Sequence, residues 1–307
     1  MSSAESTRGG RRRPSGIIWI FLAPAVLFYG VFLLYPTFNA FRISLYRWSG
    51  FGFENSTFVG LDNFKEALRD QWVHMAFSNN LIIMIGGGVL LFALALFFAV
   101  ALSNPRTRGR TFFKTSIFLP HIINPIGVAL LWIFILQPRF GMLNIFLRSA
   151  GLEELAQVWL GSRGLAMAAI VFMVVWYVIG FYMVLLIAGV EGIPPDLYAA
   201  ARIDGAGEWQ VFWRVTLPLL RDVLVIGMIY WMISALKIFG EVWALTKGQP
   251  ANSTHTIATY MMQQALPAQS TVFRMGYGTA IAVLLFVVVF CVSLLFFRLS
   301  RREAIEY

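Results

Sequence analysis

The sequence predicts an all-α membrane protein with six transmembrane helices, and three observations lead to that fold class. Of the 307 residues, 59% are hydrophobic and only 13% are charged, whereas about a quarter of the residues in ordinary soluble domains carry a charge. The apolar residues are gathered in long runs, each close to the ~20 residues that a helix needs to cross the hydrocarbon core. The basic residues lie mostly in the segments between these runs, where they orient a membrane protein.

Six segments are long and apolar enough to be spans. Four of them contain no Asp, Glu, Lys or Arg, namely 17–41, 77–103, 165–190 and 275–297. The segment 115–136 is also uncharged. Pro120 and Pro125 predict a kink or break within it, which a membrane helix tolerates when neighbouring groups bind the freed carbonyls. The segment 223–245 carries two charged residues in an otherwise apolar run.

The distribution of Lys and Arg predicts which loops are cytoplasmic. The richer set, with fourteen of these residues, consists of both termini and the loops 104–114 and 191–222. The poorer set, with nine over a longer stretch of chain, consists of the loops 42–76, 137–164 and 246–274. Because basic loops stay inside, we expect residues 1–16 and 300–307 to be cytoplasmic tails of one membrane domain at 17–299. The net charge of +9 then reflects orientation, and no nucleic-acid partner is expected.

The first span follows several arginines, as a secretory signal does. Its apolar stretch is too long for the apolar region of such a signal, and no small-residue cleavage site ends it. We therefore expect this span to be retained.

The chemical inventory of the chain argues against several enzyme classes. The chain has no His-Glu-x-x-His, no Gly-x-Ser-x-Gly and no Gly-x-x-x-x-Gly-Lys-Ser/Thr motif, which are typical of metalloproteases, serine hydrolases and ATP-binding loops. The three histidines lie far apart, and the single Cys291 offers neither a disulfide framework nor a cysteine metal site. We expect no catalytic residue, metal or cofactor on this chain. A secondary transporter or channel stays an alternative, because six spans would serve it too.

The 191–222 loop has a helical pattern of its own. Residues 196–204 contain three consecutive alanines and predict a short helix that stops at Gly205. Residues 208–215 predict a second short helix, rich in aromatic side chains, that ends just before Pro218. Two stiff helices of this kind form a knob on the cytoplasmic side, which a secondary transporter or channel would not need.

This loop resembles the EAA motif of binding-protein-dependent ABC importer permeases, whose pattern is Glu-Ala-Ala, three residues, Gly and a later apolar-Pro. The residues that match the carbohydrate-uptake form of the motif are Ala200, Ala201, Asp204, Gly205, Ala206, Phe212, Leu217 and Pro218. Other segments similar to sugar permeases of the maltose and glycerol-phosphate type are APAVLFYGVFLLYP, FVGLDNF, LPHIINPIGVALLW and WALTKGQPANSTHTI. The chain departs from the pattern at Ala199, which stands at the glutamate position.

The resemblance implies the transmembrane domain of a type I ABC importer in a bacterial cell (inner) membrane. It implies that the 191–222 loop is the coupling-helix loop, which seats on an ATPase subunit. The implied partners are a second permease subunit in a heterodimer, two ATPase subunits that bind ATP and Mg, an extracytoplasmic solute-binding protein, and membrane lipid. The implied function is ATP-driven import of a sugar or related carbohydrate, with ATP hydrolysed by the partner subunits.

A few polar and aromatic residues inside the predicted spans are candidates for the solute pathway. Lys237 and Glu241 are four residues apart, so on one helix they share a face and can pair. Such a pair suits either a solute vestibule or a structural role near the outer surface. Aromatic and hydroxyl groups on the same span suit sugar rings, and they equally suit packing. These further candidates are Tyr230, Trp231 and Ser234, together with Asn124 beside Pro125 and, as secondary candidates, His121 and Asn80.

Overall fold

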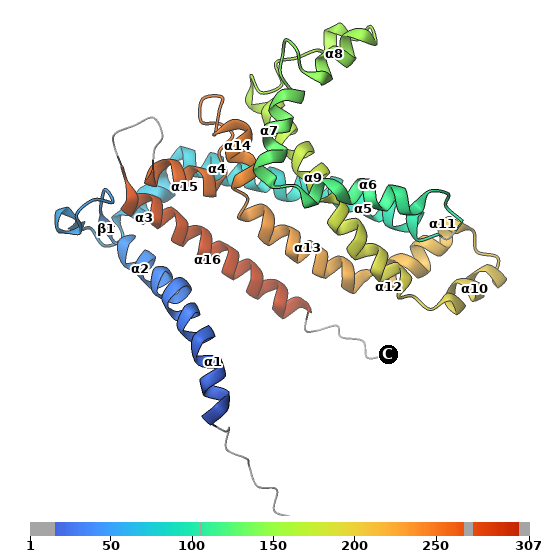
Figure 1. Cartoon of the computed structure of the whole chain (residues 1–307), viewed down its shortest axis with the longest axis horizontal. Helices are drawn as coiled ribbons and strands as arrows, with labels where there is room; N and C mark the ends of the chain where they lie inside the picture. The colour runs from blue at the N-terminus through green and yellow to red at the C-terminus, as the bar shows by residue number, and fades with distance from the viewer. Residues whose placement is uncertain (1–15, 105, 267–272, 301–307) are drawn as a thin grey trace, which may run out of the picture.

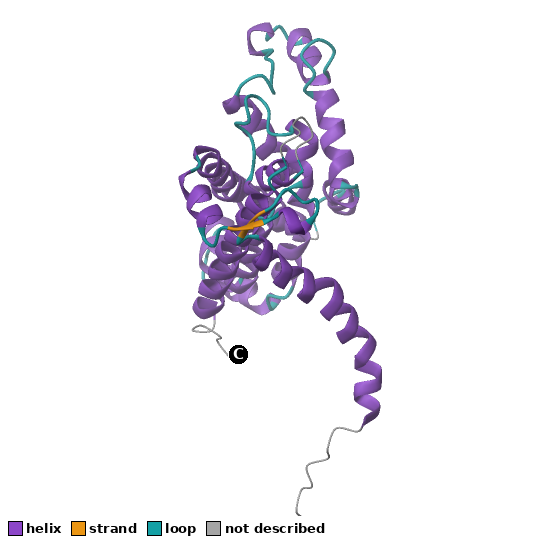
Figure 2. Cartoon of the chain, turned by 90° about the vertical axis from the view of Figure 1, so that its left-hand side faces the viewer, coloured by secondary structure: helices purple, strands orange, loops and turns teal. Residues whose placement is uncertain are grey.

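The structure of the chain is a computed structural model that describes residues 16–104, 106–266 and 273–300. Its regular elements are helices apart from one antiparallel pair of two-residue strands, β1 (Tyr46–Arg47) and β2 (Thr57–Phe58) (Figures 1 and 2). The tails predicted at 1–16 and 300–307 lie almost wholly outside the described residues.

The helices confirm the predicted spans, although two of the spans are bent. Four helical stretches are long and apolar enough to cross a membrane: Phe21–Ile43, Gln71–Ser103, Arg163–Glu191 and Met275–Phe296. Two further helix pairs pass the same test only when each pair is taken together across a bend, which brings the number to six. The all-α membrane class predicted from composition is therefore confirmed.

The first span leads away from the rest of the chain (Figures 1 and 2). It consists of α1 (Gly16–Tyr29), a π-helical turn (Gly30–Leu34) and α2 (Tyr35–Ile43). None of its apolar window is buried within the chain. An apolar helix that is exposed on every side lies against lipid or another subunit. Its backbone hydrogen bonds are satisfied within the helix, and contact of its apolar side chains with water would be unfavourable.

The C-terminal end of the first span leads into the strand pair and two helices. These are α3 (Asp62–Arg69) and α4 (Gln71–Leu81). The second span continues α4 through a π-helical segment (Ile82–Gly87) into α5 (Gly88–Ser103). Single π-helical turns release one backbone carbonyl from the regular ladder, and they recur at functional sites.

The third span is broken where its prolines predict a break. Helix α6 (Arg110–Ile122) and helix α7 (Pro125–Ile135) meet at an angle of 101°. Pro125 is the first residue of α7, where a proline costs nothing because that N–H has no helical partner. Beyond α7 the chain forms α8 (Met142–Ser149), at the top of Figure 1.

Helix α9 (Arg163–Glu191) is the centre of the fold. It packs against α5 on one side and α6 on another, and most of its apolar window is buried. At Gly180 a Cβ atom would lie 2.5 Å from the Cα of Phe118, so only glycine lets α6 approach this closely. Small residues at such crossings are typical of helix packing in membranes.

The remaining helices follow the 191–222 loop. They are α10 (Pro195–Ile203), α11 (Glu208–Val211), a π-helical turn (Phe212–Thr216), α12 (Leu217–Leu219), α13 (Arg221–Leu236), α14 (Gly240–Thr246), α15 (Ile257–Ala265) and α16 (Met275–Ser300). The fifth span, predicted as one continuous helix over 223–245, ends at Leu236 as α13 and resumes as α14. That part of the prediction is wrong.

Trp231 packs α13 against the π-helical segment of the second span and hydrogen-bonds to it. Its side chain is 3% exposed, and its indole Nε1 donates a hydrogen bond of 2.8 Å to the carbonyl of Met84. Gly87 and Gly88 make room for the ring, since a Cβ on Gly88 would lie 2.7 Å from Nε1 of Trp231. The two glycines and the tryptophan therefore form one packing unit.

We expect Gly88→Ala to destabilise the protein, because the added methyl group would push Trp231 out of its place. Overpacking of this kind costs roughly 1–3 kcal/mol. The thermal unfolding midpoint of the purified protein in detergent should fall, and a Gly88→Ala, Trp231→Leu double variant should lose little more than Trp231→Leu alone. Gly86→Ala is the matched control, because nothing lies within 4 Å of a Cβ there. Equal midpoints for Gly86→Ala and Gly88→Ala would contradict this packing role.

Candidate functional site

The 191–222 loop folds into the two short helices that its sequence predicts. Helix α10 ends in a Schellman motif: the Gly205 N–H donates to the carbonyl of Arg202 (3.1 Å) and the Ala206 N–H to that of Ala201 (3.0 Å). Gly205 itself has a φ of +80°, in the left-handed region that favours glycine. The motif residues Ala201, Asp204, Gly205 and Ala206 are therefore spaced as the C-terminal stop of a helix requires.

The second helix of the loop is attached to the first by side chains. Gln210 accepts a hydrogen bond of 3.0 Å from the N–H of Gly207, which caps α11. Arg202 on α10 pairs with Glu208 on α11 across 3.2 Å, in an exposed position where an ion pair contributes less than about 1 kcal/mol. The aromatic ring of Phe212 stacks on Trp209, with 6.0 Å between ring centroids. The Arg202–Glu208 pair thus bridges the turn between the two helices.

The surface of these two helices is unusually apolar for a loop. Ile203 is 86% exposed and Trp209 is 73% exposed, and Leu197 and Trp213 are exposed as well. The motif alanine Ala200 is also exposed on α10, as is Ala199 at the glutamate position. In Figure 1 these helices stand at the right-hand end of the molecule, where the chain also turns from α5 into α6. Exposed apolar side chains gathered at one end of a chain indicate a contact surface for another protein.

The loop continues directly into membrane helices on both of its sides, α9 before it and α13 after it. The helical segment Glu208–Leu219, which contains the motif residues Leu217 and Pro218, meets α13 at an angle of 66°. Leu220 at the bend is fully buried, and a Cβ on Gly189 of α9 would lie 2.7 Å from its Cδ2. Motion of the loop would therefore be transmitted to both α9 and α13.

The charged pair predicted in the fifth span is not a pair on one helix face. Lys237 is exposed at the C-terminal end of α13, whereas Glu241 is half-buried in the first turn of α14. No ion pair joins Lys237 and Glu241 in the part of the chain that the structure describes. The spacing argument fails because the helix stops between the two residues.

Asn80 satisfies the backbone carbonyls at the buried C-terminal end of α13, which allows the helix to end inside the bundle. Its side-chain N–H groups donate to the carbonyls of Ala235 (2.8 Å) and Leu236 (3.2 Å), and its Oδ1 accepts from the N–H of Ile257 (2.9 Å). Carbonyls at a buried helix end need such partners. Asn80, a secondary candidate for the solute pathway, is fully buried in this chain, and its side chain binds other parts of the same chain.

The neighbouring Asn79 ties further segments to the same place, and the sequence analysis missed it. It donates to the carbonyls of Ser253 and His255, each at 2.8 Å, and accepts 3.0 Å from the guanidinium of Arg163. Burial lowers the pKa of His255 to about 4, against the opposing effect of Gln263, so its imidazole is neutral. Two adjacent asparagines in a charge-free run were the signal that could have identified this cluster.

The other predicted pathway residues lie on α13 and at the break of the third span. Tyr230 is exposed and Ser234 is half-buried on α13, whereas Trp231 is in the core as described above. Asn124 is exposed at the break of the third span, where its Oδ1 caps α7 by accepting from the N–H of Ile126 (2.9 Å). The ring of His121 packs 5.4 Å from that of Tyr177 on α9.

Helices α7 and α14 pack together, so the breaks of the third and fifth spans meet. A Cβ on Gly240, the first residue of α14, would lie 3.8 Å from Ile126 near the start of α7. Glu241 and Asn124 are thus brought to neighbouring helix starts. Two interrupted spans that meet in this way are the arrangement that membrane transporters use for binding sites.

A second polar cluster lies outside the spans, at Asp70. Both Tyr260 and Tyr277 donate hydrogen bonds of 2.7 Å to its Oδ2, and the N–H of Trp72 donates to its Oδ1. Burial raises the pKa of Asp70, but these bonds and the charge of Arg274 outweigh burial and lower it overall. The carboxylate therefore stays charged and ties α4, α15 and α16 together.

Comparison with known proteins identifies the family of the chain. Residues 92–304 match the family of binding-protein-dependent transport system inner membrane components. The chain belongs to this family. Members of this permease family are the membrane components of ABC importers, and ATP is hydrolysed by separate subunits. The predictions of an inner-membrane, multi-pass permease and of no enzymatic activity of its own are thereby confirmed.

Relatives of this permease resemble it over almost their whole length. It is 33% identical to the probable ABC transporter permease protein YurN of Bacillus subtilis over 291 aligned residues. The alignment covers 94% of this chain and 98% of YurN. It is 34% identical to the diacetylchitobiose uptake system permease protein NgcF of Streptomyces coelicolor, over 96% of this chain and 87% of that one. A bacterial ABC transporter that imports the polysaccharide alginate has a chain of the same fold, with a TM-score of 0.81 at 23% identity over 94% and 96% of the two chains.

Proposed function

We propose that this permease forms half of the translocation pathway of an ATP-driven importer for a sugar or related carbohydrate. The observation that carries the proposal is the apolar two-helix knob of the 191–222 loop, joined directly to α9 and α13, in a chain of the permease family. Relatives named for diacetylchitobiose uptake and for multiple-sugar transport support the solute class.

In this mechanism the 191–222 loop is cytoplasmic and seats on an ATPase subunit. The motif residues Ala200, Ala201, Asp204, Gly205 and Ala206 shape α10 and its stop, and the exposed apolar side chains provide the contact. Because Ala199 stands where the family has a glutamate, the contact relies on shape and apolar burial more than on charge. Closure of the ATPase subunits on ATP and Mg would push the loop and tilt the spans on either side of it.

The solute would pass near the meeting point of the two broken spans. Asn124, Tyr230, Ser234, Lys237 and Glu241 are the candidate pathway residues, and each is exposed or half-buried in the single chain. An open polar face of this kind is available to a solute or to a facing subunit. Trp231 supports that face from within the core.

The remaining partners complete the importer. A second permease subunit in a heterodimer would cover the exposed apolar face of α1 and α2 and provide the other half of the pathway. Two ATPase subunits would bind the ATP and Mg. An extracytoplasmic solute-binding protein would deliver the carbohydrate to the opposite face, with both termini of this chain in the cytoplasm and residues 17–299 as the permease domain.

Reconstitution of the whole assembly tests the proposal. The chain is purified with its second permease and the ATPase subunits, placed in liposomes, and supplied with ATP inside and the carbohydrate-loaded binding protein outside. Uptake of labelled carbohydrate and stimulation of ATP hydrolysis are expected only when all components are present. Uptake of carbohydrate by this chain alone, driven by an ion gradient and indifferent to ATP, would instead establish the secondary transporter.

A further inference from the structure

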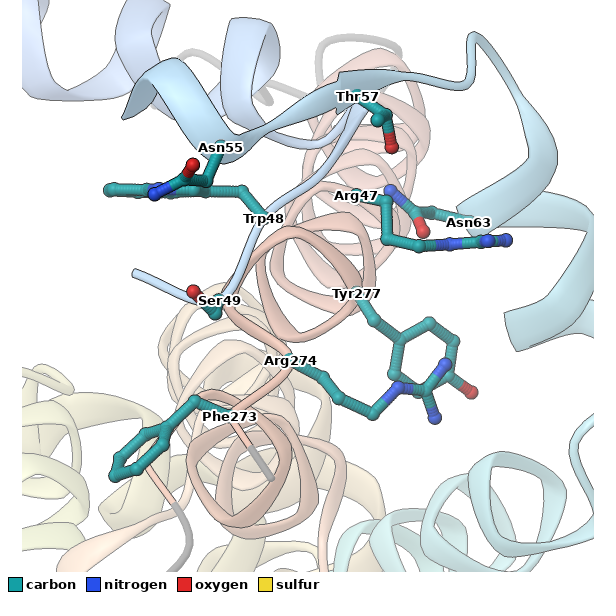
Figure 3. A pocket seen from close by; sticks show the side chains of 9 residues that line it. All are labelled: Arg47, Trp48, Ser49, Asn55, Thr57, Asn63, Phe273, Arg274 and Tyr277. Carbon is teal, nitrogen blue, oxygen red and sulfur yellow. The ribbon is translucent and has the colours of Figure 1, made fainter. Parts of the chain in front are cut away.

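We infer that a pocket between the β1–β2 strand pair and the start of α16 binds a carboxylate, presented by an acidic side chain of the solute-binding protein. The inference rests on the proposed function for the identity of the partner. The pocket has a volume of about 400 Å³. Figure 3 shows the side chains that line it, which come from both strands, the segment between them, α3, and the residues just before and in the first turn of α16.

The pocket is cationic. Arg47 and Arg274 both line it, and none of its nine lining residues is acidic. Arg274 is partly neutralised, since it pairs with Glu66 and its guanidinium lies 4.1 Å from the centre of the Tyr277 ring. Arg47 has no acidic partner within ion-pair distance among the described residues. One guanidinium group in the pocket is therefore available for an anion.

A second donor in the pocket lacks an acceptor. Trp48 also lines it, and the indole Nε1 of Trp48 is buried with no hydrogen-bond partner among the described residues. Buried indole N–H groups usually find an acceptor, and leaving one unsatisfied costs about 1–3 kcal/mol. In Figure 3 the side chain of Asn55 lies over the Trp48 ring and Ser49 follows along the strand. This N–H is enclosed by the protein, and in Figure 3 the Trp48 ring lies on the other side of the strand from Arg47, so the carboxylate would be bound by the Arg47 guanidinium and not by Trp48 as well.

The walls of the pocket are held in place before any ligand arrives. The side chain of the buried Asn63 donates to the carbonyls of Ser44 (2.8 Å) and Tyr46 (2.9 Å). The N–H of Gly276 donates 2.9 Å to the carbonyl of Trp48, and a Cβ on Gly276 would lie 2.0 Å from the carbonyl oxygen of Tyr46. The start of α16 thus touches the strand directly. A site with walls fixed in this way loses little entropy on binding.

The rim of the pocket favours a protein over a free anion. Phe51 and Phe58 flank the strand pair and are each about two-thirds exposed, and the ring of Phe51 lies 5.3 Å from that of Phe273 in the pocket wall. Arginine and aromatic residues around one pocket are the composition of interface hot spots. The charge distribution of the loops puts this segment outside the cell, on the face where a binding-protein-dependent permease meets its binding protein.

Charge reversal at Arg47 tests the inference in the complete, reconstituted complex. We expect Arg47→Glu to weaken binding of the solute-loaded binding protein by about tenfold or more, measured by surface plasmon resonance on complexes in nanodiscs. Unstimulated ATP hydrolysis should be unchanged. Arg69→Glu is the matched control, since Arg69 is exposed in the same external segment, outside the pocket, and should change the affinity by less than about twofold. An Asp or Glu to Lys substitution on the binding protein should restore affinity for Arg47→Glu alone.

The outcomes separate this inference from the proposed function. Normal affinity of Arg47→Glu, with normal stimulation of ATP hydrolysis, would reject the pocket and leave the importer intact. Calorimetric binding of free succinate that is lost in Arg47→Glu, with unchanged affinity for the binding protein, would show a small-anion site and overturn the docking role. A wild-type complex that no binding protein stimulates would overturn the proposed function itself.

Discussion

Replacing Ala201 with proline is expected to abolish carbohydrate uptake while the protein still inserts in the membrane. Proline at this interior position of α10 removes an N–H that bonds within the helix and clashes with the carbonyl of the preceding turn, at a cost of about 3 kcal/mol. The carbonyl of Ala201 also accepts the N–H of Ala206 in the helix stop. Breaking the helix there should uncouple the 191–222 loop from the ATPase, so that solute-stimulated ATP hydrolysis falls at least about tenfold together with uptake.

Two control variants show whether the backbone of α10 matters or only its side chains. Ala201→Ser keeps the N–H and the small size, and should retain most of the uptake. Asp196→Pro places the same proline in the first turn of α10, where the N–H has no helical partner, and should be tolerated far better than Ala201→Pro. If Ala201→Pro transports as well as Ala201→Ser does, the 191–222 loop is not the coupling element.

The largest expected effect on stability is that of Asn80→Ala. This change leaves two buried carbonyls and one buried N–H without their partner, and each such loss costs about 1–3 kcal/mol. We expect the thermal midpoint in detergent to fall by roughly 5–10 °C and the yield of folded protein to drop. The end of α13 should loosen first, which hydrogen exchange at 235–238 would detect.

Asn104→Ala is the matched control for Asn80→Ala. Asn104 is exposed, and among the described residues its side chain accepts a hydrogen bond only from the N–H of Arg106, close by in sequence. Its loss should shift the midpoint by about a degree or two. Similar midpoints for the two variants would show that Asn80 does not hold the break in the fifth span.

Local backbone preferences explain what could be predicted from the sequence. Apolar run length alone decides whether a segment can cross a membrane, so the six spans were found from composition. The stop at Gly205 and the break before Pro125 were also found, because glycine and proline act on their own backbone dihedrals. These features involve residues that are close together in the chain.

Long-range contacts explain what was predicted wrongly. Lys237 and Glu241 were expected on one helix face, but α13 ends between them because Asn80 and Thr256 bind the carbonyls of its last turn and beyond. Asn80 lies 155 residues before the first of these carbonyls. Trp231 was a candidate for either the solute pathway or packing, and the space opened by Gly87 and Gly88 places its side chain in the core of this chain.

The six spans and the two-helix loop follow from the chain's local chemistry, since the length of an apolar run and the helix stop at Gly205 are local properties. The point where the fifth span is interrupted, and the polar side chains that are open to a solute or a partner, depend on long-range packing. A buried helix end exists only where a side chain from elsewhere satisfies its carbonyls. Asn80 can do so only once α4 and α13 have been packed side by side.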